Sequence, residues 1–161
     1  MARAAAARSS PIAAEAPDLL AGTDLDIYRS NHVLLVRRIR ALIASDDLLL
    51  TDFRALHFLR VGTVRPTALA AALDLTPAGA TQILDRFERN GFARRTADPL
   101  DRRATIVRLT PEGIRQYDRA ARRVRDYVVA LAGSMSREGL EALRRGSEEL
   151  GRALERDRPG E

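Results

Sequence analysis

The sequence has no cysteine, no tryptophan and only two histidines among its 161 residues. Without cysteine there can be no disulfide, no thiolate metal site, no cysteine nucleophile and no thiol redox sensor. Two histidines do not supply the cluster that a His-rich metal site needs. We therefore expect neither a metal ion nor another cofactor.

Long apolar runs are also missing, since no stretch approaches the roughly eighteen residues that a membrane span requires. Residues 1–17 are rich in Ala, Arg and Ser but lack the continuous apolar segment of a secretion signal. We expect a disordered tail there, no membrane association and a bacterial cytoplasmic location. With 4% aromatic, 45% hydrophobic and 30% charged residues, the chain is typical of a helix-rich globular protein.

Lysine is absent, so all 27 basic residues are arginine and the positive charge comes from a single residue type. The net charge is +5 and the isoelectric point about 10.8. A GC-rich genome explains the arginine bias as well as function does. Arginine is nevertheless the side chain that forks onto phosphate and guanine, so an anionic partner is favoured.

Helical periodicity and capping residues divide the chain into helices. An apolar stripe predicts a helix over residues 24–44, and a second helix follows Thr51 as a possible N-cap and ends near Gly62. Shorter helices begin at Pro66 and, after the Thr76 cap, at Pro77. The two-residue link between these short helices indicates a helix-turn-helix.

The segment after Gly91 changes from helical to alternating patterning. Residues 93–96 and 105–109 are predicted strands joined by an Asp- and Arg-rich turn, which makes a β-hairpin, or wing. Helices then begin near Thr110 and Ser136, with apolar repeats of three and four. The predicted fold is mainly α, an α+β winged helix-turn-helix lobe with a helical dimerisation bundle formed by the N- and C-terminal helices. Its expected divisions are a tail (1–17), an N-terminal dimerisation helix (18–50), the winged helix-turn-helix domain (51–110), C-terminal dimerisation helices (111–156) and a frayed end (157–161).

Two stretches around the predicted wing carry a family resemblance. The first reads D-R-F-E-R-N-G-F-A-R-R over residues 85–95, and the second D-P-L-D-R-R over residues 98–103, followed by V-R-L-T-P-E-G over residues 107–113. In order and spacing they resemble the MarR family of winged helix-turn-helix transcriptional regulators, and the helical layout of residues 24–156 agrees.

The resemblance implies a homodimer that binds a pseudo-palindromic site in double-stranded DNA, with repression as the default. It also implies release by a small, often aromatic or phenolic, effector. The sequence departs from family members that sense by cysteine oxidation or metal. By resemblance, the Asp85 carboxylate pairs with Arg103 and orients the wing together with Asp101.

Small and polar side chains near the start of a recognition helix let its backbone approach base edges in the major groove. Arginines of a hairpin can reach phosphates or a narrow minor groove. Arg102 is the first choice for groove insertion, although Arg102 and Arg103 could exchange roles. The predicted DNA-binding residues are Thr76, Ala78, Gly79, Thr81, Gln82, Arg86, Arg94, Arg95, Arg102 and Arg103.

Effector contacts are expected from the first two helices, at Tyr28, His32, His57 and Phe58. For a histidine in an apolar stripe, a satisfied core position is the commoner role. The alternative function is a winged-helix protein-interaction module with a non-specific basic surface. An enzyme is not expected, because Asp98 and Asp101 lie in an exposed Arg-rich turn without a nearby His or Cys.

Overall fold

The computed structural model describes residues 23–99, 101 and 103–157. The chain divides into two compact units, Met1–Leu50 and Thr51–Glu161, each of which is considered by itself. The predicted tail at residues 1–17, Arg102 and residues 158–161 of the predicted frayed end lie outside the described residues. None of the helices in the described part of the chain combines the length and the apolar character that a membrane span requires.

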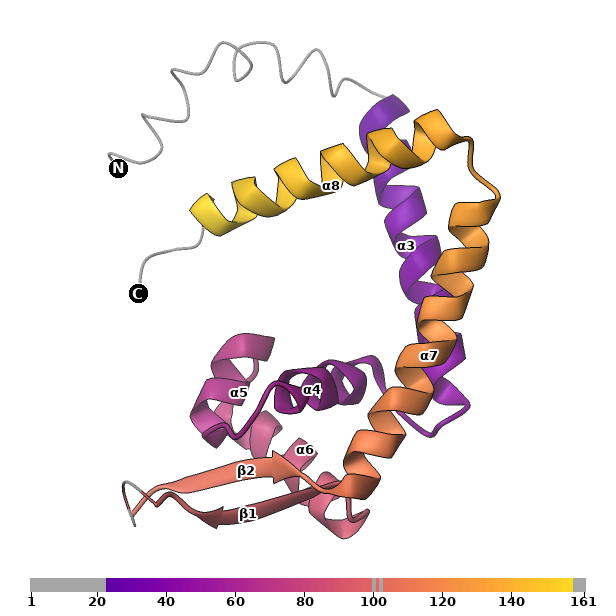
Figure 1. Cartoon of the computed structure of the whole chain (residues 1–161). Helices are drawn as coiled ribbons and strands as arrows, with labels where there is room; N and C mark the ends of the chain where they lie inside the picture. Colours follow the sequence, from indigo (N-terminus) through magenta and orange to yellow (C-terminus); the bar gives the residue numbers. More distant parts are fainter. Residues whose placement is uncertain (1–22, 100, 102, 158–161) are drawn as a thin grey trace, which may run out of the picture. The chain divides into compact units, whose positions relative to one another are not determined.

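The N-terminal unit contains one long helix, α3 (Thr23–Ala44), close to the predicted span (Figure 1). A turn ends the helix, in which the Asp46 and Leu48 backbone N–H groups donate to the Ile43 carbonyl. Some apolar side chains of α3 are exposed to solvent, among them Val33 and Leu34, which are each more than half exposed. Helix α3 therefore presents apolar surface that its own unit does not bury.

The second unit begins with three helices and a hairpin that share one apolar core. The helices are α4 (Leu50–Arg60), α5 (Pro66–Leu73) and α6 (Pro77–Arg89). Helix α4 starts at Leu50, two residues earlier than predicted, so Thr51 lies in its first turn and does not cap it. The largest fully buried side chains of this lobe are Leu56, Leu59, Leu69, Leu84, Phe87 and Val107.

The hairpin consists of β1 (Ala93–Ala97) and β2 (Thr105–Leu109), paired antiparallel as predicted. A bridge that the sequence did not indicate joins Val64 to Val107, with reciprocal backbone hydrogen bonds of 3.0 and 2.8 Å. One residue between two helices carries no periodicity signal, so this bridge could not be read from the pattern. The bridge ties the loop before α5 to the inner strand of the wing.

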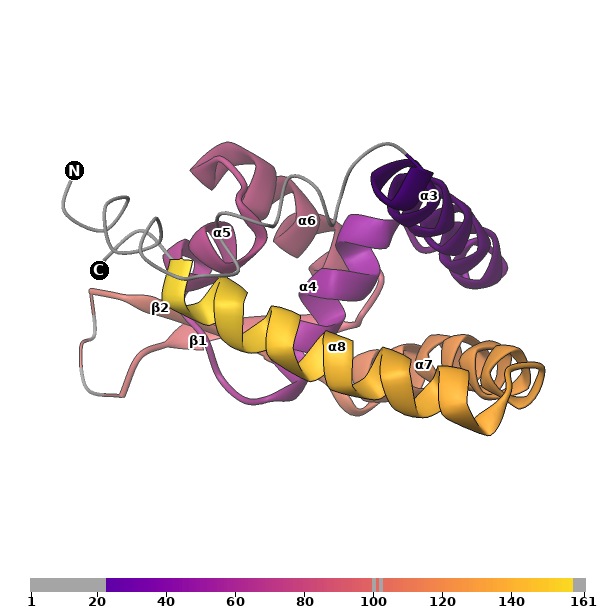
Figure 2. The ribbon, with the colours of Figure 1, turned by 90° about the horizontal axis from the view of Figure 1, so that it is seen from above.

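Two further helices complete the unit, α7 (Pro111–Gly133) and α8 (Arg137–Asp157). Thr110 and Ser136 accept hydrogen bonds from the N–H groups of Gly113 and Gly139, so both cap the helices as predicted. Helix α7 runs on from β2 (Figure 1), and α8 turns away from the far end of α7 (Figure 2). From Glu141 to Arg156 every residue of α8 is exposed.

Candidate nucleic-acid interface

The helix-turn-helix is formed by α5 and α6 and a very short link. Asp74 adopts a left-handed conformation (φ 55°, ψ 49°), and its N–H and that of Leu75 close the end of α5. The Thr76 hydroxyl then accepts from the Gly79 N–H at 3.1 Å, which caps α6. Thr76, predicted to contact DNA, therefore already has a structural task at this turn.

The exposed face of α6 begins with small and polar side chains. Ala78, Thr81 and Gln82 are exposed, whereas Ala80 and Ile83 face the core. The Thr81 hydroxyl donates to the Pro77 carbonyl at 2.9 Å, although the residue as a whole is exposed. The Gln82 side chain has no hydrogen-bond partner among the described residues, so both ends of its amide are available to a ligand.

The glycine that follows α6 sets the direction of the wing. Gly91 has φ +70°, and its N–H donates to the Glu88 carbonyl while the Phe92 N–H donates to the Phe87 carbonyl. These two bonds form a Schellman motif. The rings of Phe87 and Phe92 pack edge to face at 6.2 Å, the hydrophobic contact that accompanies such a cap. The chain thus leaves the helix at a defined angle into β1.

A single arginine clamps the hairpin to the side of α6. The Arg95 guanidinium donates to the Asp85 carboxylate at 2.6 Å and to the Glu88 carboxylate at 2.5 Å. The Glu88 carboxylate also accepts from the Arg95 backbone N–H at 2.9 Å. Partial burial acts to lower the pKa of Arg95, but the hydrogen bonds and charges of the two carboxylates raise it above its usual value. The clamp therefore stays cationic.

This clamp corrects the expected partner of Asp85. The resemblance implied Arg103, yet the Asp85 carboxylate bonds to Arg95, and Arg103 is exposed. The reason is strand alternation: Arg95 lies on the same face as its partner Val107, which is buried against the lobe. Arg95 therefore orients the wing through Asp85, a role that the family resemblance had given to Arg103.

Arg86 also has an internal partner that the sequence did not indicate. Its guanidinium forms a salt bridge with Asp52 of α4, a carboxylate that is only 2% exposed as a residue. A buried carboxylate needs a cation, because an unpaired buried charge is strongly destabilising. Arg86 thus links α6 to α4, and its predicted DNA contact is not needed to explain its presence.

The tip of the wing is held by a residue that sequence reasoning missed. Arg65, at the start of α5, donates to the Asp98 carboxylate at 2.9 and 3.3 Å and lies 3.9 Å from the Asp101 carboxylate. Asp101 also accepts from the Arg103 N–H at 3.1 Å within the turn. Asp98 therefore joins Asp101 at the wing tip, where the sequence had predicted an orienting role for Asp101 but none for Asp98. The only sequence signal for this role of Arg65 was its place directly before Pro66.

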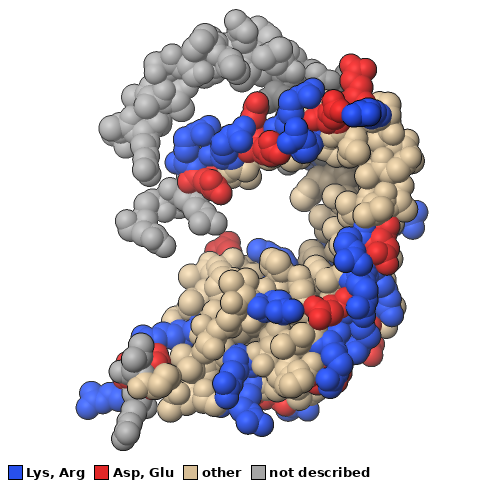
Figure 3. All heavy atoms as spheres, viewed as in Figure 1, with Lys and Arg blue, Asp and Glu red and all other residues tan. Residues whose placement is uncertain are grey.

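The remaining predicted arginines differ in their surroundings. The Arg103 side chain is exposed in the turn, while Arg102 lies outside the described residues. Arg94 is exposed too, but strand alternation places it on the hairpin face opposite Arg95 and α6. Basic side chains gather at the hairpin end and along α7, whereas acidic and basic groups alternate on α8 (Figure 3).

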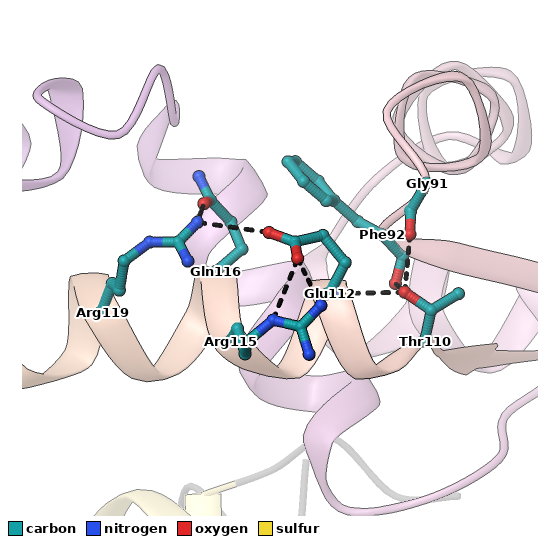
Figure 4. Close-up of polar contacts among 8 residues, drawn as sticks. Gly91, Phe92, Thr110, Glu112, Arg115, Gln116 and Arg119 are labelled. Atoms are coloured by element: carbon teal, nitrogen blue, oxygen red, sulfur yellow. Dashed lines mark hydrogen bonds and ion pairs between the residues drawn. The ribbon is translucent and has the colours of Figure 1, made fainter.

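Contacts at the junction between the wing and α7 explain the threonine and the glycine of the L-T-P-E-G stretch. The Thr110 hydroxyl donates to the Gly91 carbonyl at 2.6 Å and accepts from the Gly113 N–H at 3.1 Å (Figure 4). A Cβ on Gly113 would lie 2.0 Å from the Phe92 carbonyl oxygen, so only glycine fits. The Glu112 carboxylate accepts hydrogen bonds from Arg115 and Arg119. The hydrogen bond from Arg115 is the main cause that holds the pKa of Glu112 below its usual value.

The predicted effector residues lie in both units. His32 is exposed on α3, and the side chain of Tyr28 lies outside the described residues. On α4, His57 Nδ1 is 2.7 Å from the Tyr117 hydroxyl of α7, and Tyr117 stacks on Phe53. Burial, assisted by Asp118 and opposed by Arg60, raises the pKa of Tyr117. The effector assignment, including half-buried Phe58, stays a prediction.

Metal-binding geometry is not evident in the part of the chain that the structure describes. That part contains no group of three or more His, Cys, Asp or Glu side chains able to hold an ion.

Comparison of the sequence with known families matches residues 46–104 to the model described as "MarR family". The Multiple antibiotic resistance protein MarR of Salmonella typhimurium is 34% identical over 68 residues, 42% of this chain and 47% of that protein. An uncharacterized HTH-type transcriptional regulator of Bacillus subtilis, YkoM, is 33% identical over 70 residues, 43% of this chain and 46% of that protein. The alignments thus span about half the length of these relatives.

Solved structures agree over most of the chain. A mutant of MepR from Staphylococcus aureus superposes with a TM-score of 0.74 at 18% identity, over 83% of this chain and 99% of that one. A mutant of MarR from Escherichia coli gives 0.70 at 21% identity, over 80% and 96%. At such identities the likeness shows the fold. Residues 46–104, which hold the helix-turn-helix and the first strand of the wing, thus match the MarR family by sequence, and the chain has the fold of the solved MarR and MepR structures.

Proposed function

We propose that this protein is a homodimer that binds double-stranded DNA, with α6 in the major groove and the wing beside an adjacent minor groove. The observation that carries the proposal is the small, polar outer face of α6, held at a set angle to an Arg-bearing hairpin by the Arg95 clamp. A solved MepR mutant of the same fold is bound to an oligodeoxyribonucleotide, at a TM-score of 0.62 and 18% identity.

Base reading is assigned to Gln82 and Thr81. A glutamine amide can make paired hydrogen bonds with adenine, and a threonine methyl can contact the methyl group of thymine. Ala78 at the first turn keeps the backbone close to the bases, and the positive end of α6 favours a nearby phosphate. Arg103, exposed at the wing tip, supplies the phosphate or minor-groove contact.

The homodimer is supported by apolar surface that the second unit leaves uncovered. Leu143, Leu150 and Leu154 of α8 are 54%, 46% and 60% exposed, at helical spacings that bring them to one side. Exposed apolar stripes of this length mark protein interfaces. A second copy of the chain is the occupant we propose, because two recognition helices then meet a pseudo-palindromic site.

The proposed regulatory outcome is repression, relieved by a small aromatic or phenolic molecule, as the family resemblance implies. A reporter gene behind the bound promoter tests this directly. Loss of the protein should raise reporter output, and an active compound should reproduce that rise only while the protein is present.

The testing experiment is a mobility-shift assay with the purified full chain, DNA from upstream of its own gene and excess random competitor. A discrete shift that survives competitor is the expected result. The parallel measurement is the molar mass by light scattering, where twice the 17.8 kDa chain mass is expected. A folded dimer that shifts no DNA at low salt would refute DNA binding and favour the protein-interaction alternative.

Two variants separate base reading from phosphate binding. Gln82→Ala should change which base is preferred at one position of each half-site, with a cost of about 1–3 kcal/mol at that base. Arg103→Ala should weaken binding to all sequences and reduce the slope of log K against log salt by about 1 for each phosphate that the side chain no longer neutralises. Arg137→Ala, whose side chain is 93% exposed on α8, removes the same charge and serves as the matched control.

A further inference from the structure

Helix α8 carries its apolar side chains in one line along its exposed surface. This leucine line consists of Leu140, Leu143, Ser147, Leu150 and Leu154, at alternating spacings of three and four residues. These spacings bring all five side chains to one face of the helix. The four leucines are between 41% and 60% exposed, so the described part of the second unit leaves this face open.

The two edges of the leucine line differ in character. A step of about 100° per residue places Gly139, Gly146 and Ala153 along one edge. The same step places Arg144 and Glu148 along the other edge, where the two side chains pair at 2.7 Å and remain 65% and 50% exposed. Charges of both signs are visible along α8 in Figure 3. One edge therefore lets a second helix approach closely, and the other offers it charge.

Both edges are symmetric about Gly146. Gly139 and Ala153 lie seven residues before and after it, and Arg144 and Glu148 lie two residues before and after it. Reversing the helix about Gly146 therefore exchanges small residues with small residues and puts each charge where the opposite charge was. The centre of the leucine line lies within one residue of the same point.

An antiparallel pair of such helices matches the leucine line and both edges at once. A two-fold axis through the crossing point places the charged edge of one copy beside the charged edge of the other. Arg144 then lies opposite Glu148 of the partner subunit, and Leu143 lies opposite Leu150 of the partner subunit. A parallel pair would set the charged edge beside the small edge and would lose these ion pairs.

We propose that α8 crosses the α8 of a second copy in the antiparallel direction, with Gly146 and Ser147 at the crossing point. The proposal rests on the homodimer proposed above and adds which helix pairs with itself, in which direction and in which register. Ser147 is the one polar member of the leucine line, and a polar residue among apolar ones fixes the register of paired helices. A different protein is selected against, because the matching charges are those of the same helix reversed.

The first experiment uses the absence of cysteine, since one introduced thiol then reports a single place. A disulfide forms only when the two Cα atoms come within about 7 Å. Ser147→Cys in the full chain, oxidised with copper phenanthroline and run on a non-reducing gel, should therefore give a dimer of twice the 17.8 kDa chain mass. Arg145→Cys, two residues away on the outer face of α8, is the matched control and should stay uncross-linked.

Charge reversal tests the charged edge. Arg144→Glu places like charges across the crossing and should weaken self-association about tenfold at low salt. Adding Glu148→Arg restores opposite charges in reversed order, so the double variant should associate as the parent does. In a mixture, the parent and the double variant should each form their own dimer and few mixed dimers.

The matched control reverses the adjacent residues on the outer face. Arg145→Glu, alone or with Glu149→Arg, makes the same charge changes and should leave the dissociation constant unchanged. Sedimentation equilibrium measures association, and circular dichroism confirms that each variant is folded.

Several outcomes would overturn the pairing. They are a Ser147→Cys chain that is dimeric by light scattering yet stays uncross-linked, equal loss of association in Arg144→Glu and Arg145→Glu, and a double variant that associates no better than Arg144→Glu. A monomeric parent would refute the homodimer and, with it, this pairing. A protein that cross-links through position 147 but shifts no DNA would refute DNA binding alone, so the failures of the two proposals are distinguishable.

Discussion

The winged-helix lobe and helix α8 use apolar residues in opposite ways. In the lobe, Leu56, Leu84 and Phe87 are at most 1% exposed and pack into one core. In α8, Leu143 is 54% and Leu154 60% exposed, although their helical spacing is equally regular. Regular amphipathic patterning therefore predicts that a helix has a partner, but not whether the partner belongs to the same chain. The lobe buries its apolar side chains in its own core, whereas α8 leaves its apolar side chains exposed.

The largest contrast should come from truncating one large side chain in each region. Phe87→Ala should lower the free energy of unfolding by about 3–5 kcal/mol, because it leaves a cavity in the lobe core. Leu154→Ala should change lobe stability by less than about 0.5 kcal/mol yet weaken self-association. Urea unfolding and concentration-dependent light scattering measure the two effects. Equal loss of lobe stability in both variants would show that α8 packs on the lobe.

Glycines in the two regions offer a second contrast. Gly113→Ala should cost about 3 kcal/mol, because its Cβ would collide with the Phe92 carbonyl. Gly146→Ala in α8, with no heavy atom within 4 Å of the added Cβ, should stabilise the helix by about 0.5–1 kcal/mol. Thermal unfolding with circular dichroism compares them. A neutral Gly113→Ala would mean that wing and α7 can separate freely.

The arginine clamp sharpens the comparison within the wing. Arg95→Ala should cost about 1–2 kcal/mol, since two carboxylates lose a charge-assisted partner that is partly solvent-exposed. It should also speed amide exchange in β1 and weaken DNA binding by misorienting the wing. Arg94→Ala, on the opposite face, should change stability by less than about 0.5 kcal/mol. Equal exchange rates in the two variants would contradict the clamp.

Capping of α6 should have a smaller effect. Thr76→Ala removes the acceptor for the Gly79 N–H and should cost about 1 kcal/mol, while Thr76→Ser should retain most of that stability. Chemical denaturation measures both variants. If Thr76→Ser weakened DNA binding as strongly as Thr76→Ala, the threonine methyl would contact DNA directly, as the sequence analysis predicted.

The smallest effect concerns the contact between α4 and α7. Burial raises the pKa of Tyr117 above its ordinary value of 10.0, so the folded chain holds this proton more tightly than the unfolded chain. Its contribution is therefore complete below pH 10.0 and is lost as pH rises through the folded pKa. Tyr117→Phe should flatten the alkaline loss of stability by less than about 1 kcal/mol. An unchanged pH profile would place the Tyr117 hydroxyl in solvent.

Most elements of the fold could be predicted because their signals are local. The Thr76, Thr110 and Ser136 caps, the Pro residues at first helical positions and the glycine after α6 act within a few residues of the helix ends they define. Strand alternation likewise placed both arms of the wing. The Val64 bridge escaped prediction because one residue in a loop has no period.

The site was predicted less completely, for a physical reason that the D-R-F-E and D-P-L-D-R-R stretches illustrate. Much of what makes these stretches recognisable is internal scaffolding: Asp85 and Glu88 hold Arg95, Arg86 holds Asp52, and Asp98 is held by Arg65. The residues left facing outward on α6, Ala78, Thr81 and Gln82, lie before the first of these stretches.

By itself, the sequence determined the order of helices and strands, most of the caps that bound them and the family that residues 46–104 match. Only the tertiary structure decided which arginine meets which carboxylate, and which arginines meet none. Charged side chains dozens of residues apart come together through helix phase and strand register, and a shift of one residue sends a side chain to the opposite face. Arg95 and Arg94 are adjacent in sequence, yet one is clamped to α6 and the other faces Arg108 across the wing.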